Sequence, residues 1–144
     1  MRTISDYELE SAAGFRSALR RFLARSEEIT AVTGLTPQRY DLLLAIKTGP
    51  GERSTVTDLC RQLSMTQTAV SELVKRAEQA GLVKRNTSPT DGRVSVLALT
   101  PAGEQQLLES FIALRDERRQ LFEAVNRLGS SFRTLMHSHD EVAP

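Results

Sequence analysis

The 144-residue sequence lacks the features that mark secreted and membrane-spanning proteins. It contains one cysteine, Cys60, so no disulfide can form within the chain. No apolar run approaches the roughly 20 residues that a membrane helix needs. The first residues, MRTISDYELESAAG, are acidic and lack the apolar stretch of a secretory signal. We therefore expect a cytoplasmic protein with no membrane segment.

Motifs for catalysis and metal binding are also missing. There is no Gly-rich phosphate loop, no nucleophile elbow and no Cys/His spacing of a metal site. The two histidines, His137 and His139, stand in the segment MHSHD, where Asp140 could join them around a metal. A frayed polar tail is favoured, because a metal site needs more ligands that are held rigidly. We predict no enzymatic activity, no metal and no cofactor.

The single cysteine has two interpretations. Cys60 falls in a stripe with Val56, Leu59 and Leu63, spaced i, i+3, i+4 and i+7 on an expected helix. This spacing favours a small core residue. A redox sensor is the alternative, and it would need an exposed thiol with a lowered pKa.

Positive charge is sparse overall, because 19 Lys and Arg residues face 18 Asp and Glu residues, for a net charge of +1. The excess lies in the middle of the chain, where residues 53–100 hold seven basic and four acidic side chains. Residues 1–52 hold seven of each, and residues 101–144 hold five and seven. A basic zone between neutral and acidic ends is typical of a protein that meets phosphates with one face.

Apolar residues at helical spacing predict two helices in the first third of the chain. The first covers residues 5–32, and Gly34 is its stop signal. Thr36 and Pro37 open the second as its N-cap and its first helical residue. That helix stops at the Gly-Pro-Gly of residues 49–51.

Two short helices joined by a tight turn come next. The first begins at Thr55, which together with Asp58 matches the [ST]-x-x-[DE] start signature, and the second ends at Gly81. Thr66 is the preferred N-cap of the second helix. Ser64 with Gln67 forms a competing capping box that would start this helix two residues earlier. The apolar residues of the second helix share one face, namely Val70, Leu73, Val74 and Ala77.

The period of the sequence then changes. Segments 82–87 and 93–99 are short and β-branched or aliphatic, and turn-forming residues separate them, which predicts a β-hairpin, or wing. Thr100-Pro101 repeats the cap-plus-proline pattern and opens a long helix that we expect to reach residue 128. After Gly129 we expect one more short helix and a frayed end.

The second short helix carries a polar stripe on its outward face, which consists of Gln67, Thr68, Ser71, Glu72 and Lys75. Gln can pair with adenine through two hydrogen bonds, and Ser or Thr can bond to base edges or phosphates. The N–H groups at the start of the helix, near Thr66, also favour a phosphate. A solvated face is the alternative, but such faces carry more Lys and Glu. We predict that this helix enters a major groove.

The wing supplies a second group of candidate DNA contacts. Asp91, Gly92 and Arg93 form its tip, and Arg93 could reach a minor groove, where negative potential favours arginine. Lys84 and Arg85 are placed to meet the phosphate backbone, which adds affinity without sequence information. An ordinary charged turn would be the preferred interpretation if the two helices did not precede it.

Over nearly its whole length the chain resembles the MarR family (multiple antibiotic resistance regulators). The resemblance is densest in TVTDLCRQLSMTQTAVSELVKRAEQAGLVKR and then in D-x-R…L-x-L-T-x-x-G, which stands at Asp91, Arg93, Leu97, Leu99, Thr100 and Gly103. It implies an obligate homodimer built by the N- and C-terminal helices. It also implies the helix from Gln67 in the major groove and Arg93 in the minor groove. A small-molecule pocket would lie between the dimerisation helices and each DNA-binding lobe.

One position departs from the family pattern. Many relatives have a basic residue after Ser71, whereas this chain has Glu72. A carboxylate repels phosphate but can accept a hydrogen bond from cytosine N4, so the departure bears on the target sequence. Arg39 and Asp41 could touch an effector, although surface charge explains them equally well.

The sequence therefore predicts a mainly α fold with a small β wing in a single domain, 1–144. Residues 36–100 would form the winged helix-turn-helix lobe, and residues 1–34 and 101–144 the dimerisation helices. The predicted function is sequence-specific binding of double-stranded DNA at a pseudo-palindromic operator, as a ligand-responsive repressor. One alternative is a dimeric protein-interaction module whose winged helix no longer reads DNA. A nonspecific architectural DNA binder is another, for which more lysine would be expected.

Overall fold

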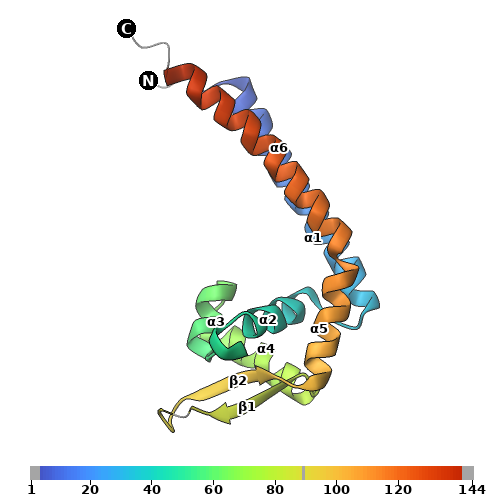
Figure 1. The fold of residues 1–144 in the computed structure, drawn as a ribbon, viewed down its shortest axis with the longest axis vertical. Helices are drawn as coiled ribbons and strands as arrows, with labels where there is room; N and C mark the ends of the chain where they lie inside the picture. Colours follow the sequence, from blue (N-terminus) through green and yellow to red (C-terminus); the bar gives the residue numbers. More distant parts are fainter. Residues whose placement is uncertain (1–3, 89, 141–144) are drawn as a thin grey trace. The chain divides into compact units, whose positions relative to one another are not determined.

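The computed structural model describes residues 4–88 and 90–140. Six α-helices, one 3₁₀ turn and one β-hairpin follow one another in these residues (Figure 1). In chain order they are α1 (Asp6–Val32), α2 (Pro37–Lys47), η1 (Pro50–Glu52), α3 (Val56–Leu63), α4 (Gln67–Gln79), β1 (Val83–Thr87), β2 (Ser95–Leu99), α5 (Pro101–Ala113) and α6 (Arg115–Asp140). The mainly α fold with a small β wing is thus confirmed. None of the helices in the described residues combines the length and the apolar character that crossing a bilayer requires.

The chain forms two compact units. Residues 29–113 make up the central unit, which contains the helix-turn-helix and the wing. Residues 1–28 and 114–144 make up the terminal unit. In the terminal unit α1 and α6 run antiparallel, since Gly14 faces Leu128 while Arg25 pairs with Glu117.

Threonine side chains cap the helices of the central unit at the predicted positions. The Thr36 hydroxyl accepts a hydrogen bond from the Arg39 N–H, and the Thr55 hydroxyl accepts one from the Asp58 N–H. Each bond satisfies a backbone donor that has no partner inside its helix. Both predicted helix starts are therefore confirmed.

Thr66 caps α4 in the same way, as its hydroxyl accepts from the Ala69 N–H at 3.2 Å. The competing start at Ser64 is wrong. Ser64 instead ends α3 in a left-handed conformation, with φ of 53°. A residue in that conformation turns the chain out of one helix and cannot cap the next in the extended geometry that an N-cap requires.

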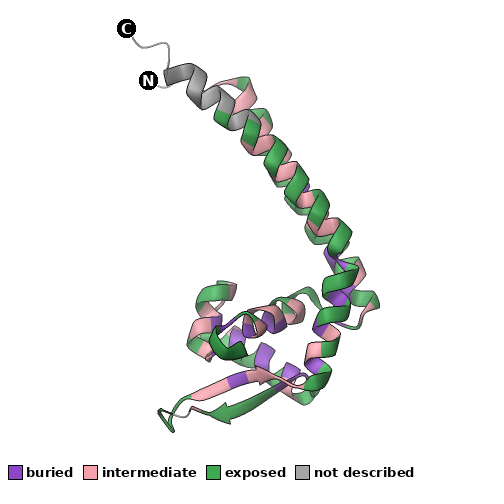
Figure 2. Cartoon of the chain, viewed as in Figure 1, coloured by how far each residue is buried: buried purple, intermediate pink, exposed green. Residues whose placement is uncertain are grey.

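A single apolar core holds the central unit together, and Figure 2 shows buried positions in α2, α3, α4 and β2. Leu42, Leu43, Leu59, Val70 and Leu97 are fully buried. The predicted apolar face of α4 is buried in full, from Val70 to Ala77. Cys60 is half-buried and packs against this core, which supports the interpretation as a small core residue.

The wing is an antiparallel hairpin whose register pairs Val83 with Leu99 and Arg85 with Leu97. Leu97 also exchanges two backbone hydrogen bonds with Ser54, which forms an isolated β-bridge at the other edge of β2. Gly81, at φ of 74°, turns the chain from α4 into β1. This left-handed conformation suits glycine, which has no Cβ to clash with the backbone.

The C-terminal helix differs from the prediction. The expected continuous helix 101–128 is interrupted at Leu114, where α5 ends and α6 begins. The Leu114 carbonyl accepts from the Arg118 N–H, and Asp116 and Glu117 place negative charge at the new N-terminus, where the helix dipole favours it. The expected stop at Gly129 is also wrong, because α6 continues through it to Asp140. The frayed polar tail that the sequence favoured for MHSHD, residues 136–140, is likewise wrong, because these residues belong to α6. Residues 141–144 lie outside the described residues.

Gly103 provides a test of the packing between α5 and the wing. A methyl group at Gly103 would lie 2.0 Å from the Leu82 carbonyl oxygen, which accepts a hydrogen bond from the Thr100 N–H. We expect Gly103→Ala to lower the free energy of unfolding by about 1–3 kcal/mol, because backbone must shift to relieve the overlap. Gly92→Ala is the control, since a methyl group there meets no atom within 4 Å. Denaturant unfolding of both variants measures the difference, and equal stability would contradict the packing.

Candidate nucleic-acid interface

The apolar anchoring of α4 determines which side chains it presents to solvent. Val70, Val74 and Ala77 have no exposed surface, so the opposite side of the helix faces outward. All members of the predicted stripe are exposed, namely Gln67, Thr68, Ser71, Glu72 and Lys75. The structure therefore brings these five sequence-predicted residues to one surface.

The N-terminus of α4 is suited to an anion. Its first turn contains no acidic residue, so nothing on the helix neutralises the positive end of its dipole. Thr66 is exposed, and its hydroxyl oxygen already accepts from the Ala69 N–H. The O–H of the same group is left to donate to a phosphate oxygen.

The two basic residues of β1 lie on opposite faces of the hairpin, because side chains alternate along a strand. Lys84 lines a hollow of about 200 Å³ that also includes Arg53 and Asn86. The Arg85 side chain turns instead to α4, and its Nη2 donates to Oε1 of Glu78 at 2.9 Å. The structure thus separates Lys84 and Arg85, which the sequence interpretation treated as a pair.

The hollow beside Lys84 contains an ionic cluster that sequence reasoning missed. The Lys47 ammonium lies 3.0 Å from the Glu52 carboxylate and also bonds to Glu104. The hydrogen bonds to Glu104 and then Glu52 raise the pKa of Lys47. Arg53 is exposed beside this cluster and adds a cation next to Lys84. No sequence pattern marked these residues, which come from separate elements.

The wing tip holds its predicted residues in a hydrogen-bonded turn. The Arg93 N–H donates to the Asp91 carboxylate at 3.0 Å, and the Val94 N–H donates to the Asp91 carbonyl at 3.1 Å. Asp91, Gly92 and Arg93 are all exposed. Asp91 therefore shapes the backbone of the tip, while the Arg93 guanidinium remains available to a ligand.

The remaining candidate residues do not form a clear site. Asp41 lines a shallow hollow between α2 and α3 with Leu44 and Gln62, and partial desolvation raises the pKa of its carboxyl. Arg39 is on the same helix but does not line this hollow. His137 and His139 fall in α6, where their side chains lie outside the described residues. Among the side chains that are described, no group of three His, Cys, Asp or Glu residues could hold a metal.

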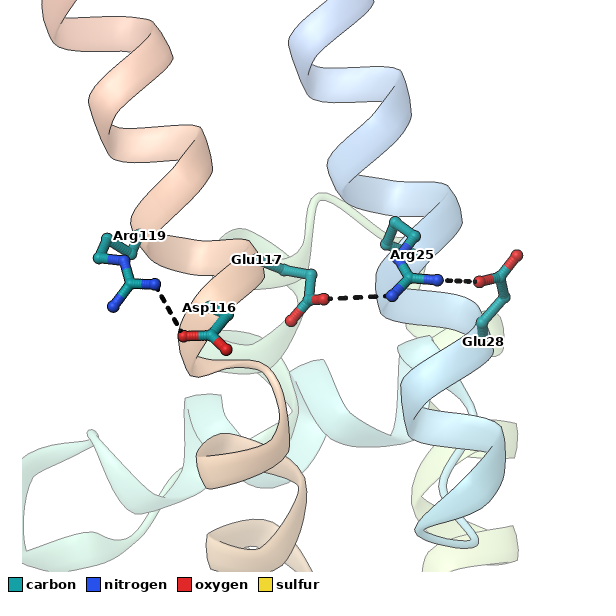
Figure 3. A network of polar contacts seen from close by, with 5 residues as sticks. All are labelled: Arg25, Glu28, Asp116, Glu117 and Arg119. Atoms are coloured by element: carbon teal, nitrogen blue, oxygen red, sulfur yellow. Dashed lines mark hydrogen bonds and ion pairs between the residues drawn. The ribbon is translucent and has the colours of Figure 1, made fainter.

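Polar contacts join α1 and α6 in the terminal unit (Figure 3). Arg25 bonds to Glu28 on its own helix at 2.9 Å and lies 3.7 Å from Glu117 on α6. Asp116 pairs with Arg119 within α6 at 3.0 Å. Beside these contacts lies a hollow of about 590 Å³, which Phe22 and other residues of the two helices line.

Comparison with known proteins finds relatives in both sequence and structure. A model of the MarR family matches residues 33–94, which extend from the end of α1 to the wing tip. The putative transcriptional regulatory protein for the hcr operon of Thauera aromatica is 31% identical over 104 residues. Over the helix-turn-helix and the wing, the chain is similar to the MarR family. The predicted resemblance to that family is confirmed. The relatives are named as transcriptional regulators and not as enzymes, in line with the expectation from the sequence.

The aligned segment covers 71% of this chain and 61% of the Thauera protein, so the chain spans about three fifths of that relative. Two solved structures share the fold. The MarR-family regulator AbsC of Streptomyces coelicolor has a TM-score of 0.75 at 20% identity, with 98% of this chain and 99% of AbsC covered. Sco3205 of the same organism, in complex with DNA, has a TM-score of 0.73 at 22% identity, with coverage of 100% and 93%.

Thr66 gives a test of how the start of α4 is built. Thr66→Ala should lower the free energy of unfolding by about 1 kcal/mol, because the Ala69 N–H loses its acceptor. Thr66→Ser retains a hydroxyl in the same place and should leave stability nearly unchanged. Thermal unfolding of the two variants makes the comparison. An alanine variant as stable as the serine variant would show that the cap does not hold the helix start.

Proposed function

We propose that this protein is a transcriptional regulator of the MarR family that binds double-stranded DNA sequence-specifically as a homodimer. The observation that carries the proposal is the surface of α4. Gln67, Thr68 and Ser71 are exposed together near a helix N-terminus that carries no acidic residue. Side chains of this kind can hydrogen-bond to base edges, and the free N–H groups can hold a phosphate.

The exposed basic residues of the wing also support DNA binding. Arg93 is exposed at the tip, and its charge suits the negative potential of a minor groove. Lys84 and Arg53 add cations on one face of the hairpin, where contact with the DNA backbone would contribute affinity without specificity. Sco3205, which shares this fold, has been solved in complex with DNA.

In this proposal residues 36–100 form the DNA-binding lobe, and residues 1–34 and 101–144 are the dimerisation helices. The regulator acts in the cytoplasm on a pseudo-palindromic operator, and each subunit reads one half-site. The family resemblance implies that the protein represses transcription and that a small-molecule effector relieves this repression. Glu72 favours the second candidate function, a protein-interaction module, because its exposed carboxylate lies on the face that would meet the DNA.

Selection of bound duplexes from a random pool tests the proposal and separates it from the alternatives. A recovered palindrome, bound more tightly than random duplex in competition, is the expected result. Binding to all duplexes alike, with a steep dependence on salt, would indicate an architectural protein. Absence of binding at low salt would leave the protein-interaction module as the function.

Two substitutions on α4 then distinguish base reading from backbone contact. Gln67→Ala should cost about 1–3 kcal/mol on the selected sequence and relax the preference at one position in each half-site. Lys75 lies about 12 Å further along the helix at 1.5 Å per residue, so Lys75→Ala should weaken all sequences by a similar factor. Titration of both variants against operators with altered bases makes the test. Equal losses for Gln67→Ala across the panel would mean that α4 does not read bases.

Exposed apolar side chains in the terminal unit support the homodimer. Phe15, Leu19 and Leu23 are spaced i, i+4 and i+8 on α1, and 45%, 36% and 56% of their surfaces are exposed. On α6, 63% of Phe122 is exposed. Clustered exposed apolar side chains of this kind mark interaction surfaces, and a second copy of the chain would cover them in a two-fold arrangement.

Sedimentation at micromolar concentration should therefore show a dimer. Leu23→Glu should weaken the dimer at least about tenfold, because it places a charge in the apolar interface. Ala13→Glu introduces the same charge at an exposed position about 120° around α1 from Leu19, the middle of the apolar stripe, and should leave the dimer intact. A stable monomer for the wild-type protein, or equal effects of the two substitutions, would rule out this dimer.

A further inference from the structure

Among the described residues, one ion pair joins α4 to the wing. The Arg85 guanidinium in β1 donates to the Glu78 carboxylate in the last turn of α4, with 2.9 Å between Nη2 and Oε1. The two side chains are 41% and 32% exposed. The Arg61–Asp58 pair within α3 is more open, at 76% and 43%. Solvent screens a charge pair less when it is partly shielded, so the pair between α4 and β1 loses less of its attraction to screening.

Arg85 occupies the point where the hairpin leaves the core. Val83, two residues earlier on the same face of β1, is buried, and so is Leu97, the cross-strand partner of Arg85. Further toward the tip, Asn86 and Thr87 are exposed, as are residues 90–94. Within the described part of the hairpin, the bond to Glu78 is therefore the outermost polar side-chain contact with α4.

The position of this contact determines how far the wing tip can move. Arg93 stands four residues before Leu97, at most about 13 Å away at roughly 3.3 Å per residue. A tilt of about 15° at the pair would move the tip by roughly 3 Å, which is the full length of a hydrogen bond. A small change in the angle between α4 and the hairpin is thus enough to break a contact that Arg93 makes with DNA.

We propose that Glu78 and Arg85 are positioning residues that hold the wing at the angle at which Arg93 meets the minor groove while α4 lies in the major groove. This inference rests on the proposed function. It also gives Arg85 a role different from the phosphate contact that the sequence predicted, because its guanidinium bonds to Glu78 of the same chain.

A thermodynamic cycle in DNA affinity tests the positioning role. It uses Glu78→Ala, Arg93→Ala and the double variant, each titrated at fixed salt against the selected operator. Loss of a carboxylate by itself strengthens binding to DNA, because repulsion of the phosphates decreases. Loss of the positioning contact weakens binding to DNA instead. We expect Glu78→Ala to weaken binding about fivefold. It should cause no further loss when Arg93 is already alanine, because Glu78 acts through the contact that Arg93 makes with the DNA.

Asp58→Ala is the matched control. It removes one carboxylate from an ion pair that lies entirely within α3, so it should not weaken binding. Thermal unfolding without DNA shows whether each variant folds. If Glu78→Ala does not, Glu78→Gln retains the size of the side chain but removes the charge that holds the guanidinium, and the same cycle should give a smaller loss of the same sign.

The outcomes separate the two proposals. Wild-type protein that selects an operator, with Glu78→Ala binding it as tightly or more tightly, overturns the positioning role alone. An equal loss from Glu78→Ala in the presence and absence of the Arg93 side chain overturns it as well. Wild-type protein that prefers no sequence overturns the proposed function, and the positioning role with it.

Discussion

Burial of one face of α4 is the constraint on which the rest of the central unit depends. Val70, Val74 and Ala77 lie in the core against Leu42, Leu43 and other residues of α2 and α3. Full burial of one such valine contributes roughly 1.5–3 kcal/mol. A rotation of α4 that changed its outward residues would expose these side chains and cost several times that amount. The orientation of the polar stripe therefore follows from the core and requires no separate interaction.

The wing and the start of α5 depend on the same core through the backbone at the end of α4. The Leu82 N–H donates to the Ala77 carbonyl, and the Leu82 carbonyl accepts from the Thr100 N–H. The Thr100 hydroxyl donates to the Gly81 carbonyl, and Gly103 leaves room for Leu82. The end of α4, both ends of the hairpin and the first turn of α5 are consequently joined within a few residues. A shift of α4 would be transmitted to the wing through this junction.

The charges of the central unit are less available than their number suggests. Residues 53–100 contain seven basic side chains, but Arg61 pairs with Asp58 and Arg85 pairs with Glu78. The other five have no ion pair among the described residues and are exposed, namely Arg53, Lys75, Arg76, Lys84 and Arg93. A small set of free cations is consistent with a net charge of +1 in a protein that meets DNA with one face.

Much of this arrangement was predictable from the sequence because its causes are local. A threonine cap acts on an N–H three residues away, so Thr36, Thr55 and Thr66 marked their helices correctly. The period of the apolar residues in α4 likewise determined which face is buried and which is polar. By contrast, the tertiary structure decided the features that depend on residues from different elements. The partner of Arg85 on α4 and the position of Arg53 beside Lys84 have no signal in the local sequence, because packing brings these side chains together. The break at Leu114, whose side chain is buried, has no local signal either. The continuation of α6 through Gly129 shows that a single glycine, which costs a helix only about 1 kcal/mol relative to alanine, is too weak a signal to end one.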